Sequence, residues 1–138
     1  GGGLGASAHG DGAHSRQVHM TNTRATDPEV LQARLPLRVK RFSRRRGSGG
    51  EGRHRGGDGL IRELELLVDG QACLLASRRD QGAPGHAGGG EGAPGEDTIR
   101  TGGQWTRWRG DPVDLKAGDC VRVETPGGGG WSKDDDQR

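Results

Sequence analysis

Glycine is the residue that most restricts what this chain can fold into. It occupies 29 of the 138 positions, whereas Leu, Ile, Val and Phe together supply only 21. That apolar share is about 15%, below the roughly 20% that ordinary globular domains exceed. A high net charge, the other mark of disorder, is missing because 21 basic and 19 acidic residues nearly cancel. The composition excludes a large, self-sufficient hydrophobic core. It leaves a disordered chain, a glycine-rich binding segment or a part of something larger.

Short alternating runs predict a mainly β fold with one short helix and long glycine-rich loops. Thr26 is expected to cap a helix that includes Glu29 and ends before Pro36, because proline forces its predecessor out of the helical region. The Asp69-Gly70 pair predicts a two-residue type I′ hairpin. This hairpin would join a strand at 60–68 to a strand at 71–77. Another strand is expected earlier in the chain, at 37–42. The later strands are expected at 60–68, 71–77, 98–100, 104–107, 113–115 and 120–125.

The ends and the cysteines indicate where such a chain belongs. The chain starts at Gly1 and its only methionine is Met20, so we expect an internal part of a longer protein whose N-terminal portion is missing. Residues 132–138 read as a solvated polar tail. Cys73 and Cys120 have neither zinc-ligand nor redox-motif spacing, and we expect two buried, reduced thiols in a cytoplasmic protein. No run approaches the ~18 apolar residues of a membrane helix.

Two polar features have both a functional and an ordinary interpretation. His9, His14 and His19 could meet at a metal ion, or they are solvated loop histidines. Residues 34–55 carry nine Lys and Arg side chains against Glu51 alone, a charge pattern that can bind nucleic acid, an anionic substrate or an acidic partner. The aromatic residues that stack on bases are nearly absent, so nucleic-acid binding is the less favoured interpretation.

Four blocks in the chain occur in the order typical of one enzyme family. The block at 19–29 reads HMTNTRATDPE, and the glycine-rich block at 47–59 reads GSGGEGRHRGGDG. Pro84-Gly85 with Gly88 to Gly90 forms the third, and TPGGGGW at 125–131 forms the fourth. With these blocks the sequence resembles the hydantoinase B/5-oxoprolinase family. The resemblance covers residues 1–131, which would be the C-terminal part of a B-type domain within a larger β-rich subunit.

The resemblance implies an ATP-dependent hydrolase that opens 5-oxoproline, hydantoin or a related lactam. In that family an A-type subunit or domain binds ATP with Mg²⁺ and phosphorylates the amide oxygen, and the B-type part opens the activated ring with water. A divalent metal, where B-type members have one, is expected in the part that precedes this chain, and this chain itself would hold no cofactor or metal. The resemblance also implies that the complete protein is an oligomer. Alternatives are a carboxylase subunit of the same family, or a non-catalytic scaffold module.

The resemblance and the local chemistry together nominate site residues. His19, Asn22, Arg24 and Asp27 precede a predicted helix start, where backbone N–H groups favour an anion such as a phosphorylated intermediate. Asn22 and Asp27 could equally satisfy loop and cap amides. Arg53, His54 and Arg55 are second candidates, with contact to the rest of the protein as the competing role.

The positions of the glycines separate order from disorder. Of the 29, 23 follow Arg46, and most of these fall in three blocks between predicted strands. Glycine at such positions allows positive φ and close backbone approach. We therefore expect tight loops packed against another domain rather than a flexible linker.

Overall fold

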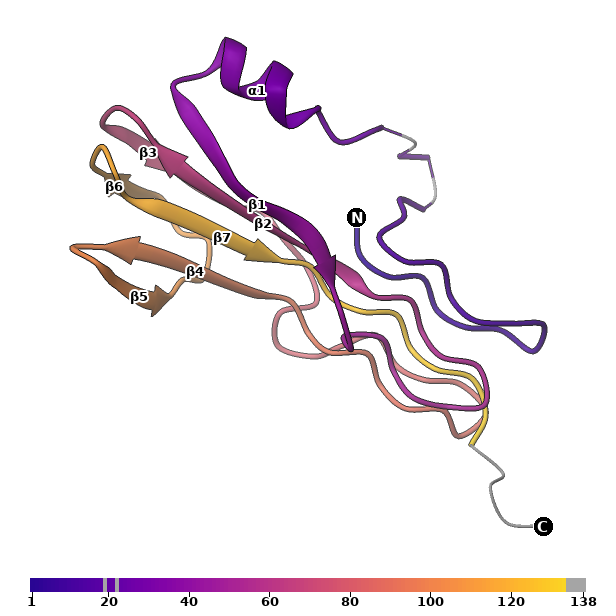
Figure 1. Cartoon of the computed structure of the whole chain (residues 1–138). Helices are drawn as coiled ribbons and strands as arrows, with labels where there is room; N and C mark the ends of the chain where they lie inside the picture. The colour runs from indigo at the N-terminus through magenta and orange to yellow at the C-terminus, as the bar shows by residue number, and fades with distance from the viewer. Residues whose placement is uncertain (19, 22, 134–138) are drawn as a thin grey trace.

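The computed structural model describes residues 1–18, 20–21 and 23–133. Figure 1 shows a twisted sheet that continues at one end into a group of extended loops. The fold is mainly β with one short helix, as the alternation predicted. The elements in chain order are α1 (Pro28–Arg34), β1 (Leu37–Arg45), β2 (Gly59–Leu66), β3 (Gly70–Ala72), β4 (Glu96–Thr101), β5 (Gln104–Arg107), β6 (Val113–Leu115) and β7 (Cys120–Glu124).

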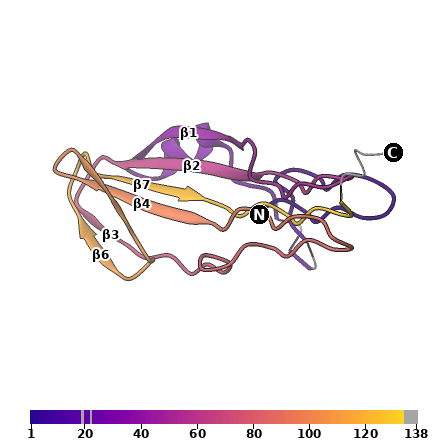
Figure 2. The same ribbon diagram turned by 90° about the horizontal axis from the view of Figure 1, so that it is seen from below.

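Five strands form one antiparallel sheet in the order β1-β2-β7-β4-β5. The β3-β6 pair lies over one face of this sheet, as the second view shows (Figure 2). The small core lies between the two layers and consists of Ile99, Trp108, Leu115 and Val121. Leu115 is the most buried large side chain, at 1% exposure. Trp108 therefore packs in the core, whereas Trp105 on the edge strand β5 lies under the Arg122 guanidinium at 4.1 Å.

The helix forms where it was predicted but with a different cap. Asp27, rather than Thr26, is the N-cap, and its Oδ1 accepts a hydrogen bond from the Glu29 N–H at 2.9 Å. A carboxylate is a strong cap because it accepts an N–H that the helix leaves unpaired. The helix ends at Arg34, two residues before Pro36.

The hairpin predicted at Asp69-Gly70 is wrong. Both edges of β2 are already paired, with β1 and with β7, so β3 cannot pair back onto it and pairs with β6 instead. Asp69 serves a different contact: its carboxylate accepts hydrogen bonds from the Ala117 N–H at 3.0 Å and from Lys116 Nζ at 2.9 Å. The two-residue hairpin occurs instead between β4 and β5. There Gly102 and Gly103 have φ of 57° and 83°.

The glycine-rich loops form a second structural unit, which we call the glycine bundle, made of residues 2–13, 48–58, 82–95 and 125–132. These extended segments lie side by side (Figure 1) and bond through their backbones. Gly128 donates its N–H to Gly57 O and accepts from Gly50 N–H, and Gly57 donates to Leu4 O. A Cβ at Gly128 would overlap the Leu4 carbonyl. The predicted close backbone approach is confirmed between segments of this chain, and packing against another domain stays a prediction.

Candidate functional site

A cavity of about 780 Å³, which we call the arginine cavity, is the first candidate site. It lies on the face of β1, β2 and β7 beside residues 15–17 and 23–25. Because side chains alternate along β2, Leu60, Arg62 and Leu64 share this face. Phe42, Leu74 and Val123 complete an apolar floor, and three arginines, Arg16, Arg24 and Arg62, also line the cavity. No carboxylate belongs to its lining among the described residues.

Arg62 is the most enclosed of these three arginines. Its Nη2 donates a 3.3 Å hydrogen bond to the Thr26 carbonyl, and its guanidinium lies 5.4 Å from the centre of the Phe42 ring. Its Nε is buried and has no hydrogen-bond partner within the described part of the chain. Arg16 and Arg24 are exposed at the cavity rim and form no ion pair among the described residues. The cavity thus combines an apolar floor with uncompensated positive charge.

The first group of predicted site residues separates in the structure. Arg24 lines the arginine cavity, whereas Asp27 caps α1. His19 and Asn22 lie outside the described residues. Sequence reasoning missed Arg16 and Arg62 as partners of Arg24. The alternation of Arg62 with Leu60 and Leu64 was the available signal that it faces the same side as the apolar floor.

The second predicted group lies at the far end of the glycine bundle. The His54 N–H donates to Trp131 O at 3.2 Å, and the Trp131 ring stacks on His86 at 4.7 Å. His54 Nδ1 lies 3.7 Å from Asp11 Oδ1, which also accepts the Arg55 N–H at 2.8 Å. These contacts hold the bundle together.

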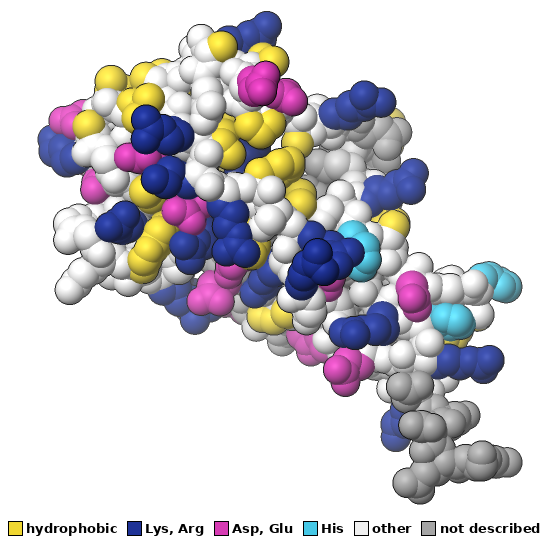
Figure 3. Space-filling view, in the orientation of Figure 1, with side chains coloured by type: hydrophobic (Ala, Val, Ile, Leu, Met, Phe, Trp, Pro, Cys, Tyr) yellow, Lys and Arg dark blue, Asp and Glu magenta, His cyan; other side chains and the backbone are white. Residues whose placement is uncertain are grey.

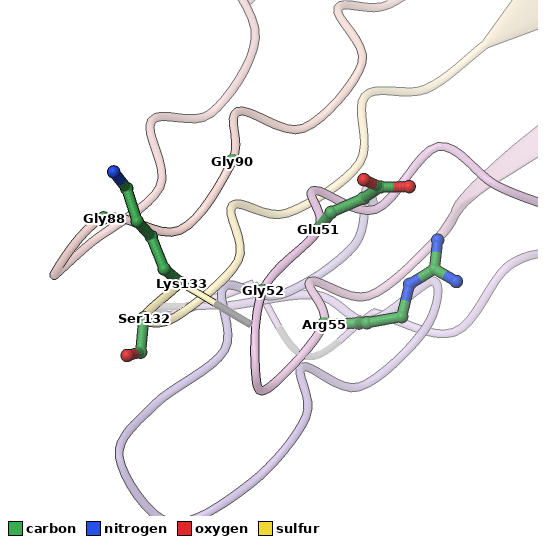
Figure 4. A pocket seen from close by; sticks show the side chains of 7 residues that line it. All are labelled: Glu51, Gly52, Arg55, Gly88, Gly90, Ser132 and Lys133. Carbon is green, nitrogen blue, oxygen red and sulfur yellow. The ribbon is translucent and has the colours of Figure 1, made fainter. Parts of the chain in front are cut away.

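A cavity of about 340 Å³ opens beside this group. Its lining comprises Glu51, Gly52, Arg55, Gly88, Gly90, Ser132 and Lys133. Figure 4 shows Glu51 and Arg55 extending toward one side and Lys133 toward the other. Arg53 is exposed and does not line it. The opposed charges of its side chains favour no single ligand charge.

A third cluster centres on Asp58, which sequence reasoning did not single out. This carboxylate is 8% exposed, and its Oδ1 accepts the Gly49 N–H at 3.0 Å. Arg44 Nε lies 3.4 Å from its Oδ2, and His14 Nδ1 accepts the Asp58 N–H at 2.8 Å. Asp58 is the only aspartate within the glycine-rich block 47–59, which was the signal that could have identified it. The polar contacts of this cluster join neighbouring loops to one another and to the end of β1.

The histidines and cysteines differ in their surroundings. His14 accepts a backbone N–H and His9 lies at a turn. The described residues contain no group of three or more His, Cys, Asp or Glu that could hold a metal ion.

The expectation that both cysteines are buried is wrong for Cys73, which is exposed, and right for Cys120. Burial raises the pKa of the Cys120 thiol, and the charge of Glu63 raises it further.

The basic stretch 34–55 is partly neutralised by acidic residues from other strands. Arg38 and Lys40 lie 3.5 and 3.6 Å from Glu65, and Arg45 lies 4.0 Å from Glu124. Figure 3 accordingly shows Lys and Arg interspersed with Asp and Glu on the face in view.

Across the described ranges of the chain, no helix has the length and apolar character needed to cross a membrane.

Comparison with known proteins gives relatives over nearly all of this chain. It is 41% identical over 133 residues to 5-oxoprolinase 1 of Arabidopsis thaliana. This alignment covers 95% of this chain and 10% of that protein. It is 36% identical over 136 residues to a 5-oxoprolinase of Dictyostelium discoideum, which covers 97% of this chain and 11% of that protein. The chain therefore spans about one tenth of these curated relatives.

Two solved structures share the fold. The ATP-dependent caprolactamase from Pseudomonas jessenii is similar with a TM-score of 0.78 at 24% identity, over 96% of this chain and 24% of that chain. The nucleotide-free structure of acetone carboxylase is similar with a TM-score of 0.74 at 17% identity. The match covers 95% of this chain and 22% of that chain. This chain corresponds to a small part of much larger enzymes. The family of hydantoinase B/oxoprolinase matches residues 1–134, and the chain belongs to that family.

Proposed function

We propose that this chain is the C-terminal part of the B-type domain of an ATP-dependent cyclic-amide hydrolase. Its substrate class is 5-oxoproline, hydantoin or a related lactam. The observation that carries the proposal is the 41% identity to a 5-oxoprolinase over 95% of this chain, together with the family match. Residues 1–131 would belong to the B-type domain, and residues 132–138 would be its polar tail.

The proposed chemistry overcomes the resonance of an amide. An A-type subunit or fused domain would bind ATP with Mg²⁺ and transfer the γ-phosphoryl group to the amide oxygen, which releases ADP. Water would then attack the activated carbon and the ring C–N bond would break, which leaves an acyl phosphate on the opened chain. A second water would hydrolyse the acyl phosphate to a carboxylate and inorganic phosphate. A divalent metal, where the B-type domain uses one, would be held by residues outside this chain.

Arg24 is the residue of this chain that we propose for orienting the phosphorylated intermediate, with Asn22 beside it in the sequence. The support is that Arg24 lines the arginine cavity together with two further guanidinium groups. The start of α1 does not contribute to the proposal, because the Asp27 carboxylate already accepts an N–H there.

The test is Arg24→Ala in the complete enzyme, assayed for ATP-coupled ring opening. A charge-assisted hydrogen bond contributes about 1.5–3 kcal/mol, so we expect kcat/KM to fall by roughly 10- to 100-fold. Arg100→Ala removes an exposed guanidinium from β4 and is the matched control, with unchanged kinetics expected. Unchanged kinetics in a stable Arg24→Ala enzyme would contradict the proposed role.

A carboxylase subunit is the second candidate, favoured by the shared fold with acetone carboxylase. The two reactions are separated by supplying the complete enzyme with labelled bicarbonate and ATP. A hydrolase opens the lactam without label, whereas a carboxylase transfers label to an organic product.

A scaffold role is the third candidate. In that case a complete enzyme with Arg24→Ala retains its A-type partner and its full activity.

Nucleic-acid binding through residues 34–55 is the least favoured function. It requires an affinity for nucleic acid that falls steeply with salt, so an affinity that does not change with salt would exclude it.

A further inference from the structure

The arginines of the arginine cavity differ in their charge balance from three paired arginines elsewhere in the fold. Arg44, Arg79 and Arg122 each face a carboxylate, Asp58, Asp97 and Glu63 respectively. Arg16, Arg24 and Arg62 come from three separate parts of the chain, line one cavity and form no ion pair among the described residues. A cavity with three guanidinium groups and no lining carboxylate attracts an anion with more than one negative charge.

Arg62 carries an unmet hydrogen-bonding requirement. Its buried Nε lacks a partner within the described chain, and a buried charged donor without a partner is costly. The Thr26 carbonyl and the Phe42 ring hold this guanidinium in place at the cavity. An anion beside this guanidinium would therefore meet a cation that is already oriented, and would compensate its charge without further ordering.

The floor of the cavity indicates that the ligand is more than a free ion. Leu60, Leu64, Leu74 and Val123 line the cavity beside the exposed Phe42 ring. The volume of about 780 Å³ lies within the range of roughly 300–1,000 Å³ that small organic ligands occupy. A lining that combines apolar side chains with three arginines matches a ligand with an organic body and an anionic group.

We propose that the arginine cavity binds an organic monophosphate, with its phosphoryl group against Arg16, Arg24 and Arg62 and its organic body on the apolar floor. A dianionic phosphoryl group offers three oxygens to three guanidinium groups, whereas a carboxylate carries one charge and fits one bidentate arginine. The inference rests on the proposed function in one respect: a phosphorylated cyclic amide is one ligand of this class.

The test is calorimetric titration of the complete protein, without ATP, with phenyl phosphate as the probe. Benzoate, inorganic phosphate and benzyl alcohol are the comparison ligands. We expect phenyl phosphate to bind at least 10-fold more tightly than any of the three. Equal affinity for phenyl phosphate and inorganic phosphate would overturn the inference, because the apolar floor would then contribute nothing. Absence of saturable binding would overturn it as well.

Variants place the binding at this cavity rather than at another phosphate site of the protein. Arg62→Met and Arg16→Gln are each expected to weaken phenyl phosphate binding at least 10-fold, and Arg62→Lys to restore part of it. Arg16 is exposed, so its variant remains informative where Arg62→Met fails to fold. Arg100→Gln on β4 is the charge-matched control and is expected to bind normally. Unchanged affinity in folded Arg62→Met and Arg16→Gln would overturn the site.

The binding assay separates this inference from the proposed function. If phenyl phosphate binding depends on Arg62 while the complete enzyme opens no lactam, the site stands and the proposed function fails. If the enzyme opens a lactam while its binding and kinetics ignore Arg62→Met and Arg16→Gln, the site fails and the function stands.

Discussion

Glycine acts in this molecule mainly through the absence of Cβ rather than through unusual backbone angles. Positive φ occurs at Gly47, Gly88 and the turn glycines Gly102, Gly103 and Gly118, but not at Gly127 to Gly130. At those four positions a Cβ would overlap backbone atoms of a neighbouring segment. The sequence indicated both uses of glycine, and the structure shows that close approach dominates within the fourth block.

Substitution of a bundle glycine tests this conclusion. Gly128→Ala places a methyl group against the Leu4 carbonyl, a backbone atom that cannot rotate away. Overpacking of this kind costs typically about 1–3 kcal/mol, and we expect a loss of at least that size in the free energy of unfolding. Gly10→Ala is the matched control, since nothing lies within 4 Å of its Cβ position. Urea unfolding measures both, and equal stability of the two variants would contradict the close-approach account.

Asp69 makes stability depend on pH in one direction. The Ala117 N–H, followed by Lys116, lowers the pKa of this carboxyl below its ordinary value of 3.8. A lowered pKa in the folded state means that the stabilisation is present above pH 3.8 and is lost as the pH falls through the folded value. We expect Asp69→Asn to be less stable than the wild type at pH 7, with the two converging in acid. Thermal unfolding between pH 7 and 2 is the measurement, and a constant difference down to pH 2 would contradict this assignment.

At the scale of elements, local signals predicted positions better than pairings. Alternation placed β5 and β6 at their observed bounds and β7 within one residue. The hairpin wrongly predicted at Asp69 concerned which strands pair with each other. Strand pairing depends on which strand edges remain free in the folded sheet. Helix position was likewise local, but the choice between Thr26 and Asp27 as cap depended on side-chain geometry that a sequence does not carry.

The loop before β4 is attached to the sheet by a buried ion pair. Arg79 Nε and Nη2 lie 2.8 and 3.1 Å from the two carboxylate oxygens of Asp97, which is 3% exposed. Removing one partner of a buried pair costs about 3–5 kcal/mol, because the other charge stays buried. We expect that loss for Arg79→Met.

The Arg109–Asp80 pair is the matched control for this substitution, with side chains 75% and 85% exposed at 3.8 Å. Exposed pairs contribute about 0–1 kcal/mol, so Arg109→Met should unfold at nearly the wild-type urea concentration. A loss in Arg109→Met as large as that in Arg79→Met would show that burial is not the deciding factor.

At the scale of the whole molecule, the chain has little apolar burial. The buried hydrophobic residues among those described are Ile61, Ile99, Trp108, Leu115, Cys120 and Val121. Native domains are stable by about 5–15 kcal/mol, and we expect the isolated chain to lie at or below the lower bound. Urea unfolding of the isolated chain measures this. A value near 10 kcal/mol would show that the bundle hydrogen bonds supply what the core does not.

Activity belongs to the same scale. The chain spans about one tenth of its 5-oxoprolinase relatives, and its proposed site receives a ligand that another part of the enzyme would phosphorylate. We expect the isolated chain to release no phosphate from ATP with 5-oxoproline, and the complete enzyme to release it together with ring opening. Phosphate release by the isolated chain and by the complete enzyme, measured side by side, checks this. Turnover by the isolated chain would contradict the assignment of the phosphorylation step to another part of the enzyme.

The sequence by itself determined the family, the mainly β character, the close approach of the glycine blocks and the positions of most strands. The strand expected at 71–77 is an exception, because β3 ends at Ala72. The features determined in this way follow from local alternation and from residue types, which any stretch of chain displays without its neighbours. It also nominated Arg24. Only the tertiary structure decided that Arg16 and Arg62 join Arg24, that β3 pairs with β6, and that four glycine segments bond into one bundle. The physical reason is that pairing, charge compensation and close approach are properties of surfaces that meet, and these surfaces lie far apart in the sequence.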